Sequence, residues 1–185
     1  SLQTQELNHH GKELGAVYGA GAISTEVAPK VTVSEVNGLI VTKVYLDLTG
    51  LKKANDVGDA IGLDGTANAS LFSWDSAVHG DVLVESSLAC IELPTAASNV
   101  LLDFDVLSAT ATLAYDGDVA GESDVKTLFA AGGNCGLGKT IQDLDVESPA
   151  TSGDKVYLCD GATSTGADTF TAGKLVLTFK AYKSF

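Results

Sequence analysis

The sequence contains no arginine and no methionine, and all 11 of its basic residues are lysines. These lysines stand against 24 aspartates and glutamates, which gives a formal net charge of −13 at pH 7. Arginine supplies most of the two-pronged hydrogen bonding by which proteins grip phosphate and guanine, and a negative field repels polynucleotides. The composition therefore predicts no direct binding to nucleic acid.

Cysteine is scarce as well, with three residues at wide spacing: Cys90, Cys135 and Cys159. No two of them have the short spacing of a zinc site or a redox pair, so we expect free thiols. Reduced thiols and the lack of an apolar leader at the N-terminus indicate assembly in a cytoplasm. No apolar run approaches the roughly 18 residues that cross a bilayer, which predicts a soluble protein without membrane contact.

Long helical patterns are missing too, and short stretches of alternating apolar and polar residues take their place. In residues 38–51, Lys43 and Asp47 fall on one phase and a nearly apolar set falls on the other: Ile40, Thr42, Val44, Leu46 and Leu48. Residues 174–182 place Leu175, Leu177, Phe179 and Ala181 opposite Lys174, Thr178, Lys180 and Tyr182. Alternation of this kind is typical of strands with one buried face.

Three further stretches complete the strand pattern. Residues 81–94 change their inward phase near Ser86 and Ser87, which predicts a β-bulge. Residues 100–106 alternate with one apolar face: Val100, Leu102, Phe104 and Val106. The acidic and glycine-rich stretch 51–70 lacks helical spacing and predicts a long ordered loop.

These patterns predict an all-β fold with seven to nine strands. Turn signals between the strands favour a single-domain antiparallel β-sandwich, jelly-roll-like in its connections. Residues 1–29 lack sustained periodicity and predict an irregular N-terminal arm that is not a packed element. The sandwich domain then spans residues 30–185.

One stretch, "GGNCGLGKTI" at 132–141, matches the phosphate-binding loop of nucleotide-binding proteins through Gly133, Gly138, Lys139 and Thr140. That loop holds phosphate only where a helix follows it, because the helix N-terminus supplies free N–H groups. Acidic and β-branched residues follow here, and the chain soon meets Pro149. We therefore expect a glycine-rich hairpin turn with Lys139 as a surface charge, and nucleotide binding through residues 133–140 is a remote alternative.

Two acidic stretches invite comparison with cation sites. Asp116 and Asp118 are in phase with a calcium-binding loop, but Thr127 stands where its bidentate acid belongs. The second stretch holds three aspartates without the spacing of such a loop: Asp56, Asp59 and Asp64. Solvated acidic turns are the commoner outcome, so we expect no metal site.

Catalytic residues are also lacking. His9 and His10 are adjacent in the predicted arm without a surrounding ligand cluster, and His79 is the one remaining histidine. No serine occurs in a nucleophile-elbow pattern. The sequence predicts a protein that is not an enzyme and that uses no cofactor.

Several strand and turn stretches, in this order, carry a resemblance: "GLIVTKVYLDLTGL" with "NDVGDAIG", "LACIELPTAASNVLLDFDV", "GGNCGLGKTI" and "DKVYLCDG…TFTAGKLVLTFKAY". Over residues 30–183 the chain resembles small head-associated structural proteins of tailed phages, many of them from marine and cyanobacterial hosts. The resemblance implies a non-enzymatic capsid cement or decoration protein, located in the virion on the capsid exterior. The resemblance further implies that the protein binds the outer surface of the assembled head and stabilises it.

The partner implied by this resemblance is the major capsid protein of the same phage, and a homo-oligomer, with a trimer favoured, is expected. The candidate capsid or subunit contacts are exposed apolar and aromatic residues near the two ends of the chain: Leu2, Leu7, Tyr18, Tyr182 and Phe185. The alternative is a virion-borne module that binds the host surface or glycans. Such a module needs clustered aromatic side chains, and the sequence has one tryptophan and five scattered tyrosines.

Overall fold

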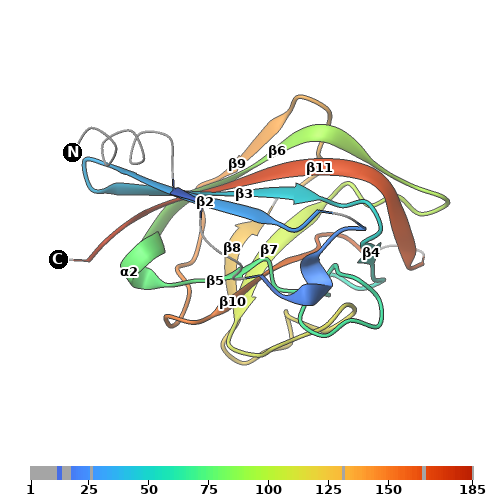
Figure 1. Cartoon of the computed structure of the whole chain (residues 1–185), viewed down its shortest axis with the longest axis horizontal. Coiled ribbons are helices and arrows are strands. Elements are labelled where there is room, and N and C mark those ends of the chain that lie inside the picture. The colour runs from blue at the N-terminus through green and yellow to red at the C-terminus, as the bar shows by residue number, and fades with distance from the viewer. Residues whose placement is uncertain (1–11, 14–17, 26, 131, 164–165, 185) are drawn as a thin grey trace.

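Two antiparallel β-sheets packed face to face form the body of the protein in a computed structural model (Figure 1). The structure describes residues 12–13, 18–25, 27–130, 132–163 and 166–184, and only the backbone of 12–13. Each sheet buries one face against the other, which is the sandwich arrangement. The predicted all-β sandwich is confirmed, and the finer jelly-roll connectivity stays a prediction.

The larger sheet lies across the upper part of Figure 1 and the smaller sheet below it. The larger sheet consists, in spatial order, of β1 (Lys12–Glu13), β2 (Lys30–Val36), β3 (Leu39–Asp47), β11 (Asp168–Tyr182), β6 (Val82–Ala96) and β9 (Thr140–Asp143), with β4 (Lys52–Lys53) paired to β11. The smaller sheet consists of β5 (Phe72–Ser73), β10 (Lys155–Asp160), β7 (Phe104–Ala109) and β8 (Lys126–Ala130). The helical turns in the described residues are η1 (Ala20–Ala22) and α2 (Ser76–His79).

The core forms where the apolar phases of the two sheets meet. In β3 the buried positions alternate from Ile40 to Leu46 and include Thr42, as predicted. In β11 the predicted inward residues, Leu175 to Ala181 in steps of two, are all buried. The smaller sheet contributes Phe104, Val106, Val156 and Leu158 to the same cluster.

Local irregularities fix the register of the larger sheet. Asn37 and Gly38 both have positive φ, at 52° and 81°, which is the geometry of the two-residue turn that suits a twisted hairpin. In β6, Lys180 pairs with Glu85 and the next residue pairs with Leu83, so that Val84 is extra. The predicted bulge is therefore present, close to its predicted position.

The predicted alternation over residues 100–106 is wrong for the first residues of this stretch. The strand begins only at Phe104, Val100 is 46% exposed, and Leu101 is buried in its place. The backbone before Phe104 bonds to loops instead of a neighbouring strand: Leu102 O accepts from Cys135 N and Asp103 O accepts from Gly161 N. Because residues 100–103 do not belong to a strand of either sheet, their side chains need not alternate between a buried and an exposed face.

The prediction of an unpacked lead-in over residues 1–29 is wrong for residues 19–24. Gly19 N donates to Ser70 O at 2.7 Å, Gly21 N donates to Asn68 O at 2.8 Å, and Ala22 is buried in the core. A Cβ at Gly19 would lie 2.0 Å from Asn68 O, so this close approach requires glycine. Residues 1–11 of the predicted arm lie outside the described part of the chain.

The alternation in β11 gives a direct test of the fold. Phe179 is buried against Phe72 and Trp74, so Phe179→Ala should lower the free energy of unfolding by about 3 to 5 kcal/mol. Lys180→Ala, on the opposite face, should lower it by at most about 1 kcal/mol, because exposed ion pairs contribute little. Urea denaturation of both variants measures the difference, and equal losses would contradict the assigned faces.

Candidate binding surface on the larger sheet

The face of β2, β3, β11 and β6 that points away from the smaller sheet, here called the outer face, carries a set of unusually apolar side chains. Directly paired residues of antiparallel strands project on the same side, so the register gives the layout of this face. Tyr45 pairs with Lys30 on one side and with Val176 on the other, and Val176 pairs in turn with Ala89. These residues make one row across four strands.

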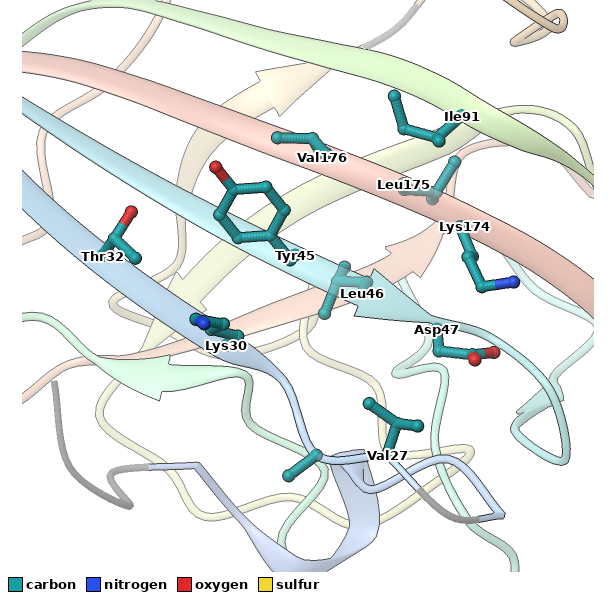
Figure 2. Close-up of a pocket in the computed structure, with 11 residues that line it drawn as sticks. Val27, Lys30, Thr32, Tyr45, Leu46, Asp47, Ile91, Lys174, Leu175 and Val176 are labelled. Atoms are coloured by element: carbon teal, nitrogen blue, oxygen red, sulfur yellow. The ribbon is translucent and has the colours of Figure 1, made fainter. Parts of the chain in front are cut away.

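A groove with a volume of about 640 Å³ lies along this row. Figure 2 shows Tyr45 between Thr32 and Val176, with Val27 and Ile91 at opposite sides of the groove. Val27 is 50% exposed and Ile91 is 57% exposed. Ile91 reaches this position because it is an extra residue in β6, where Cys90 and Glu92 pair with consecutive residues of β11. The groove therefore depends on a bulge as well as on the strand pattern.

A second apolar row crosses the same face at the end of the sheet that holds the β2–β3 turn. Its members pair in sequence across the strands, and we call them the end row: Val36, Leu39, Tyr182 and Val82. Val36, Val82 and Tyr182 are 53%, 47% and 43% exposed. Tyr45 lies six positions after Leu39 in β3, which puts the end row about 20 Å from the groove.

Charged side chains lie between and beside these two rows. Lys180 Nζ donates to Glu85 at 2.7 Å and Lys174 Nζ donates to Glu92 at 2.7 Å. The hydrogen bond from Lys180 lowers the pKa of Glu85, and the bond to Glu92 raises the pKa of Lys174. Lys43 is exposed between the rows, and no ion pair of its ammonium is found among the described residues.

Only one predicted contact residue can be placed on this face. Tyr182 belongs to the end row, whereas Tyr18 is half-buried next to Gly19 and is not part of the outer face. Leu2, Leu7 and Phe185 lie outside the described residues. The sequence did contain a signal for an apolar outer face. The outward-facing positions of residues 39–47 include the apolar or aromatic residues Leu39, Val41 and Tyr45.

The phosphate-loop match is a turn in the structure. Lys139 N donates to Gly136 O at 2.8 Å, Gly138 has φ of +73°, and the chain enters strand β9 at Thr140. Gly138 N donates to Cys90 O, so these N–H groups are used within the protein. A strand stands where the phosphate-holding helix would have to begin. The predicted turn is therefore present, but it is not the predicted hairpin, because the strands before and after it, β8 and β9, belong to different sheets.

The three cysteines are free, as predicted, and all three are buried. Burial, followed by the neighbouring Cys90 thiol, raises the pKa of Cys135 to about 12. Burial also raises the pKa of Cys159 well above its ordinary value. The thiolate is the reactive form of cysteine, so neither side chain is activated for nucleophilic chemistry.

The two acidic stretches of the sequence meet in space. Ala60 N donates to Gly117 O at 2.9 Å, and Asp160 N donates to Asp59 O at 3.1 Å. Burial, then Asp116, raises the pKa of Asp59. Asp64 is separate from this cluster and bonds to Lys52 at 2.8 Å. In the described part of the chain, no three histidine, cysteine or acidic side chains are placed to hold a metal ion.

His79 is a buried part of the aromatic core. Its Nδ1 lies 3.0 Å from the Thr42 hydroxyl, and its ring is 5.0 Å from Phe72 and 5.2 Å from Trp74. Burial lowers its pKa to about 4. His79 is therefore neutral near pH 7 and packs as part of the core. His9 and His10 lie outside the described residues.

Comparison of the chain with protein-family models, curated proteins and solved structures finds no match. None of the described helices is long and apolar enough to cross a membrane.

The buried carboxyl of Asp160 gives a prediction about pH. Burial raises its pKa from 3.8 to about 7, against the opposing effect of Lys53. The stability that its protonated form contributes is complete below pH 4 and is lost as pH rises through 7. Relative to the parent protein, Asp160→Asn should therefore become more stable as pH rises from 4 to 8, by up to about 4 kcal/mol over this range.

Urea denaturation between pH 4 and 8 tests this expectation. Asp64→Asn is the matched control, because the bond to Lys52 lowers the pKa of this exposed carboxyl. The control should give no gain at pH 8. A gain for Asp160→Asn that does not depend on pH would show that Asp160 is not the titrating group.

The turn at 136–139 gives a prediction about nucleotides. ATP or GTP with magnesium should leave the melting temperature unchanged, since a strand follows the turn and its N–H groups are bonded internally. Lys139→Ala should behave in the same way as the parent protein in a thermal-shift titration. Micromolar nucleotide affinity that disappears in this variant would overturn the assignment of the turn.

Proposed function

We propose that the chain is a non-enzymatic phage capsid cement protein, which binds the outer surface of the assembled head and stabilises it. The observation that carries the proposal is the outer face, where exposed apolar rows occur on a protein with a net charge of −13. Contiguous apolar surface of this kind is typical of protein contacts. The resemblance of residues 30–183 to head-associated phage proteins supports the same function.

A cement protein acts by mass action. Because it binds the complete lattice better than free or disrupted shell subunits, its binding free energy is added to the stability of the shell. This role needs a rigid module with one adhesive face, and it needs no reacting group. The neutral His79 and the buried thiols are compatible with such a role. Trimers on the lattice would multiply a weak single contact into tight attachment.

A second candidate, the glycan-binding module, draws support from the groove. Tyr45 is 42% exposed there, and Thr32, Asp47 and Lys174 provide polar groups beside it. An exposed aromatic ring with flanking hydrogen-bonding groups suits the stacking of a sugar ring. The groove offers one aromatic side chain, so the cement function is the stronger proposal.

Particles that lack the protein provide the test. They should still assemble, because a cement is added to a completed shell, but they should release DNA at a lower temperature than decorated particles. The measurement follows DNA release during heating of both particle types. If both are equally stable and undecorated particles no longer adsorb to host cells, the glycan-binding module replaces the cement function.

A further inference from the structure

We infer that the outer face is the surface by which this chain docks onto the capsid shell, and that the shell presents a carboxylate to Lys43 between two apolar contacts. The identity of the partner rests on the proposed function. The choice of face and the chemistry of the partner surface rest on the layout of exposed side chains and charges.

The apolar contacts lie at the two ends of the outer face. The groove around Tyr45 is open to an apolar side chain of the partner, since Val27 and Ile91 form its sides. The end row with Tyr182 offers a second contact about 20 Å away along the strands. Four strands span about 15 Å, so the two rows frame an area of about 15 Å by 20 Å, which is smaller than a standard protein interface and fits a weak single contact.

Charge separates the outer face from the rest of the molecule. Lys30, Lys43, Lys174 and Lys180 project from it against three acids, Asp47, Glu85 and Glu92. Other carboxylates lie away from this face, as in the acidic cluster around Asp59, where burial and then Asp116 raise the pKa of Asp59. The outer face is thus the part of this acidic chain where its own field opposes an acidic partner least.

Lys43 gives the face its chemical preference. Its neighbours in the same row are Thr32 and Thr178, which offer hydroxyl groups and no charge. Lys180 and Lys174 are already bonded to glutamates, whereas no ion pair of Lys43 occurs among the described residues. A partner carboxylate placed over this row would be matched in charge and partly shielded by the apolar rows.

A second copy of the chain fits the same face less well. Face to face, two copies would bring Lys43 and Lys180 of both chains into one central zone, where, among the side chains that the structure describes, the two Glu85 carboxylates oppose them. Like charges brought together in this way oppose association. The face therefore suits a different protein with acidic side chains better than it suits itself.

The experiment measures binding to expanded heads that lack the protein. The test variant is Lys43→Gln/Val82→Ser on the outer face. The control is Lys126→Gln/Val57→Ser, which makes the same changes on the smaller sheet and its loops. The two valines are almost equally exposed, at 47% and 46%. The test variant should bind at least about tenfold more weakly, and the control should stay within about twofold of the parent.

A footprint on the unmodified protein keeps the inference testable if a variant fails to fold. An amine-reactive reagent should label both Lys43 and Lys126 in the free protein. In decorated heads it should still label Lys126, whereas Lys43 should be protected. Protection of Lys126 with continued labelling of Lys43 would overturn the choice of face and leave the cement function standing. Failure of the unmodified protein to bind heads would overturn both, and sedimentation as a dimer would then favour the second copy.

Discussion

Strand β11 is hydrogen-bonded along both of its edges, and the rest of the structure depends on this arrangement. It pairs with β3 on one side, with β6 on the other, and with β4 at its beginning. A strand held in this way can present side chains only to its two faces. One side of β11, with Phe179, closes the core. The other side, with Val176 and Tyr182, belongs to the outer face, where β11 lies between β3 and β6.

Two polar groups inside the sandwich have a hydrogen-bonding partner, which matters because an unpaired buried group is costly. Thr42 meets His79, and the Ser86 hydroxyl donates to Leu128 O, which ties β6 to the smaller sheet. Burial raises the pKa of Asp160 to about 7, although Lys53 and the Ala54 N–H oppose this shift. This carboxyl belongs to β10 of the smaller sheet and is not part of the outer face.

The molecule therefore has two unlike sides. The smaller sheet and its loops carry acidic side chains, among them Asp59 and Asp160. The outer face of the larger sheet carries apolar rows, lysines and a groove. This division suits the proposed cement protein, which needs one side for adhesion and another exposed to solvent. The same division would serve a glycan-binding module if the Tyr45 groove were its site.

The sequence alone determined the fold class, the buried phases of β3 and β11, the bulge in β6 and the turn at 136–139. These features are local, because alternation and turn chemistry are encoded by neighbours along the chain. Only the tertiary structure decided that residues 19–24 pack, that Val100 faces solvent, and that Tyr45 and Ile91 share a groove. Those outcomes depend on which strands and loops pair, and such partners lie far apart in the sequence.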